Sequence, residues 1–305
     1  MIAGVTTLKR WMASIKIECG IWYDVLRIMA LAPLDTFGKL TVLCFDEMKV
    51  EEIYEYNRKW DEVMGPYKKM QVLMARGLCR KWKTPLFVDF DQRMTEEIIV
   101  EVTSRLYAIG YNVVACVSDQ GSENRGFLRK MGVTPKTPYF LHPITKKKIV
   151  YFPDVPHLLK LFRNWLLDTG FILADGTIVT KESLEKLLAL ISTEINVACR
   201  LTKDHIDVKK SQRQNVRLAA QLCSHTVATA LIHYGIDPKL GEVIQKVSDW
   251  FDVFNVRTKT ASGPLNSPYG MSHVKSTQAK ILEDLRNLMA GMTCIGKKKN
   301  SVQVS

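Results

Sequence analysis

Hydrophobic and polar positions follow two different patterns along this chain. In the first half, short apolar runs rich in β-branched and aromatic residues predict strands, and segments of helical period lie between them. The predicted elements are strands over 39–48, twice within 70–91 and over 111–119, and helices over 94–110 and 122–131. Strands that alternate with helices predict an α/β layer structure.

Beyond about residue 154 the pattern becomes helical throughout. The segment DVPHLLKLFRNWLLDTG places Asp154 as an N-cap, Pro156 in the first turn and Gly170 past the end. Further amphipathic segments follow over 181–195, 215–235, 240–255 and 276–291. A second, helical domain is therefore predicted. Residues 1–33 are ambiguous, with a short helix over 6–16.

Charge and length limit the choice of partners. The chain has 305 residues and a formal net charge of +12, which favours polyanionic partners such as nucleic acid or nucleotides. The alternative, which charge alone leaves open, is a basic soluble protein without such a partner. Basic clusters occur at Lys146 to Lys148, around Trp82 and at Lys297 to Lys299. Phosphate contacts from such clusters would be independent of sequence and sensitive to salt.

Cysteine usage and hydropathy indicate the compartment. The seven cysteines are scattered and mostly lie in apolar stretches, without the spacing of a zinc site, so they indicate small buried side chains in a reducing environment. The apolar stretch after Cys19 carries Asp24 and Arg27 and is too short to span a bilayer. We therefore expect an intracellular protein without a membrane partner.

Two aspartates at strand ends are the candidate chemistry. Asp46 ends the first strong strand, and Asp119 ends the apolar strand over 111–119. Carboxylates at the ends of neighbouring strands converge where α/β sheets bind ligands, and two of them can share a Mg²⁺ ion with substrate phosphates. The alternative is that each aspartate is a helix cap or a turn residue, and Glu47 and Asp91 share this ambiguity.

Several long words in the sequence carry a resemblance to a known family. They are FDEMKV, KWKTPLFVDFD, VVACVSDQGSENRGFLRKMG, FPDVPHLLKLFRNWLLDTGF, NVRLAAQLCSHTVATAL and DWFDVFN, in this order along the chain. Together they resemble the P element transposases and their THAP-domain-containing relatives. The resemblance implies an RNase H-like mixed sheet with helices, interrupted by an all-helical insertion domain that binds GTP.

The resemblance also implies roles for individual residues. Asp46 and Asp119 become the first two catalytic acids, which hold Mg²⁺ or Mn²⁺ for DNA cleavage and strand transfer. The implied GTP contacts are Asp252, Asn255, Lys203, Val216 and Ser224. The chain contains no G-x-x-x-x-G-K-[ST] loop, so a GTP site here is not of the P-loop kind. Without the family, WFDVFN reads as an apolar helix end with solvated polar residues.

The sequence departs from the family pattern near its end. Family members supply a third acid, a glutamate, after the insertion domain, and Glu283 lies in a segment that matches the insertion domain itself. We therefore expect a truncated, catalytically incomplete transposase, or alternatively a non-catalytic nucleotide- and DNA-binding regulator. The expected partners are DNA, GTP and a second copy or a full-length transposase, and the expected location is the nucleus.

The expected organisation has four parts. They are a helical N-terminal extension over 1–33, the RNase H-like part over 34–154, the insertion domain over 155–290 and a basic tail over 291–305.

Overall fold

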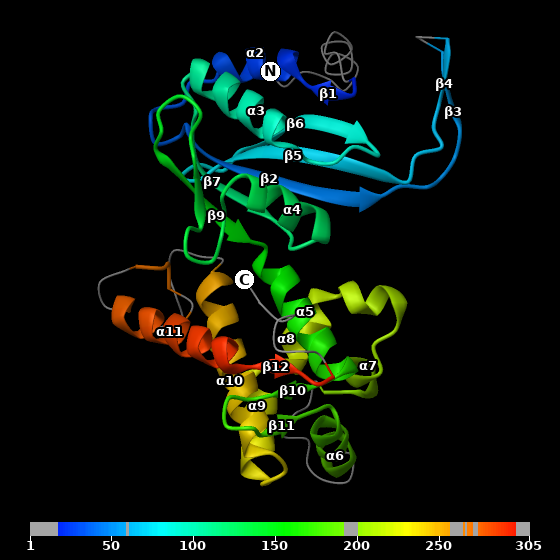
Figure 1. Ribbon diagram of the computed structural model, residues 1–305, viewed down its shortest axis with the longest axis vertical. Helices are drawn as coiled ribbons and strands as arrows, with labels where there is room; N and C mark the ends of the chain where they lie inside the picture. The colour runs from blue at the N-terminus through cyan, green and yellow to red at the C-terminus, as the bar shows by residue number, and fades with distance from the viewer. Residues whose placement is uncertain are drawn as a thin grey trace, which may run out of the picture. The chain divides into compact units, whose positions relative to one another are not determined.

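The computed structural model describes residues 18–58, 61–191, 201–256, 265, 267–270 and 274–296. The chain divides into two compact units between Asp154 and Val155 (Figure 1). The short helix predicted over 6–16 and the lysines 297–299 lie outside the described residues. Within the described part, no helix is both long enough and apolar enough to cross a membrane.

The first unit is built on a mixed sheet of seven strands in the order β1-β6-β5-β2-β7-β9-β8. Its elements are β1 (Gly20–Ile21), α2 (Tyr23–Ala30), β2 (Leu40–Lys49), β3 (Glu55–Asn57), β4 (Glu62–Met64), β5 (Lys69–Gly77), β6 (Lys83–Phe90), α3 (Glu96–Ala108), β7 (Asn112–Ser118), α4 (Ser122–Lys130), β8 (Tyr139–Leu141) and β9 (Lys148–Pro153). Strands β3 and β4 form a separate two-stranded hairpin.

The register of three neighbouring strands aligns their carboxyl ends. Strand β2 runs parallel to β7, and their pairing ends at Phe45 and Ser118. Strand β7 runs parallel to β9, and that pairing ends at Ser118 and Pro153. Because these last pairs are side by side, the residues that follow them lie at one common end of the parallel strands.

Three helices share one hydrophobic core with the sheet. Leu43 and Phe45 of β2 are buried with apolar residues from α2, α3 and α4. Phe127 of α4 meets Phe45 edge to face at 5.7 Å between ring centroids. Since successive side chains of a strand point to opposite faces, Asp46 points to the face opposite this helical core.

Two expectations about the first unit need correction. The part of the predicted extension that is described, from residue 18 to 33, belongs to this unit: β1 pairs with β6, and Leu26 and Met29 are buried in its core. The contact removes apolar surface of α2 from water, so the segment is not separate. In addition, Asp46 lies inside β2 and does not end it, because the antiparallel pairing with β5 continues to Lys49.

The second unit consists mainly of helices. Its elements are α5 (Val155–Asp168), β10 (Phe171–Ile172), β11 (Ile178–Val179), α6 (Glu182–Ile191), α7 (Lys203–Ile206), the 3₁₀ helix η1 (Lys210–Gln214), α8 (Val216–Leu222), α9 (His225–His233), α10 (Pro238–Phe254), α11 (Lys275–Gly291) and β12 (Thr293–Cys294). Helix α5 begins where β9 ends. The fold class predicted from the sequence, an RNase H-like α/β part followed by a helical part, is confirmed.

Three details of this unit differ from the expectation. A small three-stranded sheet, β11-β10-β12, means that the unit is not entirely helical. Pairing of β12 with β10 also places Thr293 and Cys294 in this unit and not in a tail. The single helix predicted over 215–235 is divided at Cys223 and Ser224, because the Ser224 side chain accepts a hydrogen bond from Val227 N and starts α9.

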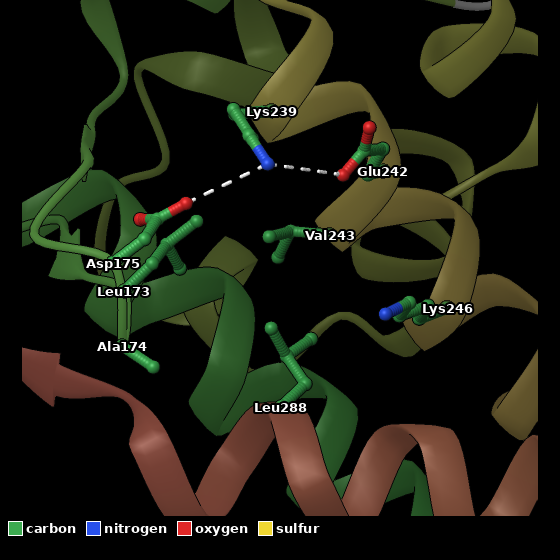
Figure 2. A pocket seen from close by; sticks show the side chains of 8 residues that line it. All are labelled: Leu173, Ala174, Asp175, Lys239, Glu242, Val243, Lys246 and Leu288. Carbon is green, nitrogen blue, oxygen red and sulfur yellow. Dashed lines mark ion pairs between the residues drawn. The ribbon is translucent and has the colours of Figure 1, made fainter.

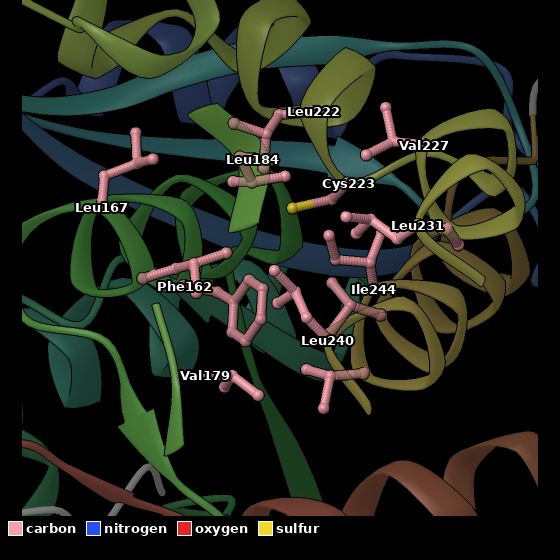
Figure 3. Packing of buried hydrophobic residues seen from close by; sticks show 14 of the residues in the cluster. Phe162, Leu167, Val179, Leu184, Leu222, Cys223, Val227, Leu231, Leu240 and Ile244 are labelled. Atoms are coloured by element: carbon pink, nitrogen blue, oxygen red, sulfur yellow. The ribbon is translucent and has the colours of Figure 1, made fainter. Parts of the chain in front are cut away.

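The core of the second unit is shown in Figure 3. Side chains from α5, α6, α8, α9 and α10 meet there, together with Val179 of β11. The labelled members are Phe162, Leu167, Val179, Leu184, Leu222, Cys223, Val227, Leu231, Leu240 and Ile244. Burial raises the pKa of the Cys223 thiol to about 12, so this cysteine remains protonated as a packing residue.

Candidate functional site

The parallel strands bring Asp46 and Asp119 to the same edge of the sheet. Each aspartate directly follows a member of the last parallel pair, Phe45 and Ser118. Neighbouring strands lie about 4.8 Å apart, so the two backbones are at a distance that carboxylates can bridge through one ion. Asp46 is exposed and Asp119 is half-buried. The structure therefore unites two residues that are far apart in the sequence.

Asp119 is oriented by the start of α4. Its Oδ1 accepts hydrogen bonds from Gly121 N at 3.1 Å and from Asn124 Nδ2 at 2.6 Å. Oδ2 has no hydrogen-bond partner among the described residues. The hydrogen bonds to Oδ1 are those expected of a turn residue, whereas Oδ2 is available to a ligand.

A buried tyrosine fixes the strand ends beside Asp119. The Tyr151 hydroxyl lies 3.1 Å from Ser118 Oγ and accepts a hydrogen bond from Gln120 Nε2 at 3.3 Å. Burial raises the pKa of Tyr151 to about 12, so the hydroxyl remains protonated and able to donate. Asp154 N donates to Ser118 O at 2.8 Å, which joins the end of β9 to the same edge.

The candidate metal ligands at this edge are two carboxylates. Within the described part of the chain, no group of three or more His, Cys, Asp or Glu side chains is placed to hold a metal ion. Two carboxylates still fit a Mg²⁺ or Mn²⁺ site of the kind that substrate phosphates complete. The assignment of Asp46 and Asp119 as metal ligands stays a prediction.

The other acids near this edge have structural partners. Glu47 accepts a hydrogen bond from Lys69 Nζ at 2.7 Å. The Asp91 carboxylate accepts hydrogen bonds from the backbone N–H groups of Lys68 and Lys69. These contacts explain both acids without a ligand.

Three of the five residues predicted to contact GTP lie on α10 or at the caps of α9 and α10. Ser224 is the N-cap of α9, while Asp252 lies near the C-terminal end of α10 and Asn255 is its C-cap. Asp252 is half-buried, and burial together with the charge of Asp249 raises the pKa of its carboxyl. A carboxylate and a carboxamide at one helix end can accept from and donate to the edge of a purine base.

A polar chain beside Asp252 was not predicted from the sequence. His225 Nδ1 is hydrogen-bonded to Gln245 Oε1, and Gln245 Nε2 donates to Asp249 Oδ1 at 2.7 Å. Burial raises the pKa of the Asp249 carboxyl. The sequence does place Gln245 and Asp249 four residues apart on α10, which indicates that they share one helix face and can form a hydrogen bond.

The remaining two predicted contacts lie on other elements. Val216 is the first residue of α8. Lys203 lies on α7, where it is exposed and pairs with Asp207 at 3.7 Å. Among the described residues Lys203 forms no hydrogen bond or ion pair with α10. A shallow pocket at Lys203 is lined by Glu185, Leu188, Ala189, Ile206 and Asp207.

A different pocket of this unit contains none of the predicted residues (Figure 2). Lys239 pairs there with Asp175 at 3.5 Å and with Glu242 at 3.7 Å, above a floor of Leu173, Val243 and Leu288. The pairs neutralise Lys239, and we assign no function to this pocket.

Two family models match the chain. The TNP-like RNase H N-terminal domain matches residues 17–132, and the TNP-like GTP-binding insertion domain matches residues 156–268. The fold and the two matches thus define an RNase H-like domain of the transposase class, followed by an insertion domain of the GTP-binding type. The first match includes β1 and α2, in agreement with the pairing of β1 in the sheet and the burial of α2 in the core of the first unit.

The chain belongs to the P element transposase family, as its sequence predicted. It is 34% identical to Transposable element P transposase of Drosophila melanogaster over 295 residues, 93% of this chain. It is 28% identical to DNA transposase THAP9 of Homo sapiens over 214 residues, 64% of this chain. Its structure matches the solved Drosophila P element transposase strand transfer complex with a TM-score of 0.87 and 32% identity, over 98% of this chain and 69% of that chain.

The match covers only part of each curated relative. The chain spans 38% of the length of the Drosophila protein and 24% of the human protein.

Proposed function

We propose that this chain carries the first part of a DNA-processing RNase H-like domain, whose Asp46 and Asp119 hold a divalent cation, and a helical domain that binds GTP. One observation carries the metal site: both aspartates directly follow the paired residues Phe45 and Ser118 on adjacent parallel strands. Support for DNA as the substrate comes from the strand transfer complex that the chain resembles and from its net charge of +12.

The residues at the sheet edge would act by position. A bound Mg²⁺ or Mn²⁺ would polarise a phosphodiester and stabilise the charge that develops on it. Asp46 would supply an oxygen from the open face of the sheet, and Asp119 would supply Oδ2 while Asn124 holds Oδ1. Gln120, Ser118 and Tyr151 keep the β7 end in place, so the ligands need no rearrangement to receive the ion.

The nucleotide site is proposed at the end of α10. A deprotonated Asp252 can accept two hydrogen bonds from N1–H and the N2 amino group of guanine, whereas adenine presents no such pair of donors there. Asn255 would bond to the remaining base or ribose atoms. We include Ser224, Val216 and Lys203 in the same proposal, with Lys203 supplying a cation for phosphate.

A second candidate function is a regulator that binds DNA and GTP without cutting. The absence of a third metal-holding side chain among the described residues favours it. Such a protein would act in the nucleus, beside a full-length transposase. Incubation of duplex DNA with the purified chain and Mn²⁺ decides between the two, because product strands would exclude the regulator.

Binding of Mn²⁺ tests the metal site directly. Electron paramagnetic resonance should detect bound Mn²⁺ in the native chain and at least tenfold weaker binding after Asp46→Asn with Asp119→Asn. Glu47→Gln is the matched control, since it neutralises an adjacent acid on the other face. Unchanged affinity in the double variant would remove Asp46 and Asp119 from the site.

Nucleotide titration tests the second site separately. GTP should bind more tightly than ATP, and Asp252→Asn should weaken GTP by about 10- to 100-fold, the range of a lost hydrogen bond to a charged group. Glu242→Gln on the same helix should change nothing. Equal affinities for GTP and ATP would refute guanine recognition by Asp252.

A further inference from the structure

The second unit contains a fully buried arginine. Arg163 of α5 is 0% exposed, although arginine is almost never fully buried unless its charge is paired. Within the described part of the chain, no carboxylate forms an ion pair with it. Asp168, an acid on the same helix, pairs with Arg213 instead. The charge of Arg163 is therefore accommodated by other polar groups.

These groups are mainly the backbone carbonyls of the 3₁₀ helix η1. Arg163 Nη2 donates to Arg213 O at 2.7 Å and to Gln212 O at 3.4 Å. Nε donates to Asn164 Oδ1 at 2.8 Å, and Nη1 has no hydrogen-bond partner among the described residues. Burial lowers the pKa of the Arg163 guanidinium, which reflects the cost of removing the cation from water. A charge kept at this position despite that cost indicates that the place of η1 matters.

Two more contacts attach η1 to α5. Lys160 Nζ donates to Gln214 Oε1 at 3.1 Å, and Arg213 Nη1 donates to Asp168 Oδ1 at 3.0 Å. Lys210, the first residue of η1, has φ +39°, a left-handed conformation that side chains other than glycine rarely adopt. Such a conformation persists only where the surrounding structure holds it. Helix α5 thus fixes η1 in one conformation.

Helix α8 connects η1 to the residues predicted to contact GTP. Val216 is the first residue of α8 and follows η1 after one intervening residue. Ser224 stands two positions beyond the last residue of α8. His205 Nε2 is hydrogen-bonded to Gln221 Oε1 at 3.1 Å, which joins α8 to α7, the helix of Lys203. The position of α8 therefore affects three of the five predicted contacts.

The side chains around the start of α8 are basic. Lys209, Lys210 and Arg217 are exposed, and none of them forms an ion pair with another described residue. The end of α10, in contrast, carries the half-buried Asp252. Unpaired cations attract phosphate, whereas a carboxylate repels it. The start of α8 is thus suited to the phosphates of a nucleotide, and the end of α10 to its base.

We propose that Arg163 is a positioning residue of the nucleotide site: it holds η1 by the carbonyls of residues 212 and 213 and so places α8, with the cations beside it, against the phosphates of GTP. Arg163 itself does not touch the nucleotide. This inference rests on the proposed GTP site, and it adds which side of that site takes the phosphates and what holds this side in place.

Comparison of GTP with GMP tests the proposal, because GMP keeps the base but lacks the β- and γ-phosphates. Calorimetric titration of the native chain should show tighter binding of GTP than of GMP. Arg163→Met should weaken GTP at least tenfold and GMP less than threefold, and Arg163→Lys, which keeps the charge, should weaken GTP less than Arg163→Met does. Leu166→Ala is the matched control, since it removes a buried side chain of the same helix and lowers stability without touching η1. Its ratio of GTP to GMP affinity should equal the native ratio.

The outcomes separate this inference from the function on which it rests. A native chain that binds neither nucleotide would overturn both. Binding of both nucleotides, with the same affinity ratio in the native chain and in Arg163→Met, would overturn the role of Arg163 alone. If Arg163→Met does not fold, Arg163→Lys decides, because an unchanged ratio there would equally remove the role. Binding of a short DNA duplex is measured in parallel: if Arg163→Met reduces DNA binding tenfold and leaves GTP affinity unchanged, the cations near α8 serve nucleic acid and the proposal is wrong.

Discussion

Replacement of Asn124 by alanine separates the structural role of Asp119 from its proposed ligand role. Asn124 is buried on α4, and its amide donates to Asp119 Oδ1 at 2.6 Å. The second bond to that oxygen, from Gly121 N, would remain. The perturbation therefore removes one of the two groups that orient the carboxylate and leaves the carboxylate itself in place.

The size of the effect follows from the charge and burial of this contact. A hydrogen bond to a charged group contributes about 1.5–3 kcal/mol, and Asn124 is shielded from water, so we expect Asn124→Ala to lower the free energy of unfolding of the first unit by about 2 kcal/mol. Loss of a side chain that orients a metal ligand commonly reduces metal affinity 10- to 100-fold, and we expect Mn²⁺ affinity to fall in this range.

Two measurements check these values. Hydrogen exchange of peptides from α4 in increasing urea reports the first unit separately from the second, which matters because two units need not unfold together. Mn²⁺ affinity is measured by electron paramagnetic resonance. Ser122→Ala, at an exposed position of the same helix, is the control. Mn²⁺ affinity within twofold of the native value, despite the lower stability, would refute the orientation of a ligand by Asn124.

Three further predictions address pH and packing. Burial and the charge of Lys146 lower the pKa of His142, so the unfolded state binds a proton at higher pH than the folded state does. The free energy of unfolding should therefore decrease as pH falls below about 6.5. Urea melts at several pH values should show this slope, and His142→Gln should lack it. Burial and, after it, the charge of Asp249 raise the pKa of Asp252, so Asp249→Asn should move the acid limit of GTP binding to lower pH, and an unmoved limit in titrations downward from about pH 8 through the acid limit would contradict the coupling. Gly241→Ala would place a Cβ 2.9 Å from Ala228 O and should lower the melting temperature of the second unit in calorimetry by several degrees; an unchanged melting temperature would show that α9 and α10 are less tightly packed than described.

Segments with the clearest hydrophobic periodicity or the longest apolar run were predicted correctly as a helix or a strand. The helix predicted over 94–110 is α3, whose N-cap Thr95 accepts a hydrogen bond from Ile98 N. The apolar run over 111–119 is β7, buried between β2 and β9. Short elements left no such signal. Strand β1 has two residues and β8 has three, and a period cannot be read from so few positions.

Interruptions of a regular pattern were also invisible in the sequence. Apolar positions continue at helical spacing through 215–235, although the chain breaks the helix at Cys223 and Ser224. The break depends on a side-chain bond to Val227 N, which competes with the helical ladder. This break places His225 at the start of a new helix, where it reaches Gln245 of α10.

The amino-acid sequence alone determined the family, the α/β and helical halves and the identity of the two candidate acids, because these depend on local composition, period and long matching words. Only the tertiary structure decided that Asp46 and Asp119 share one sheet edge, that Asn124 orients Asp119, and that a polar chain lies beside Asp252. Such contacts depend on strand register and helix packing, which join residues far apart in the chain, and no local pattern encodes them.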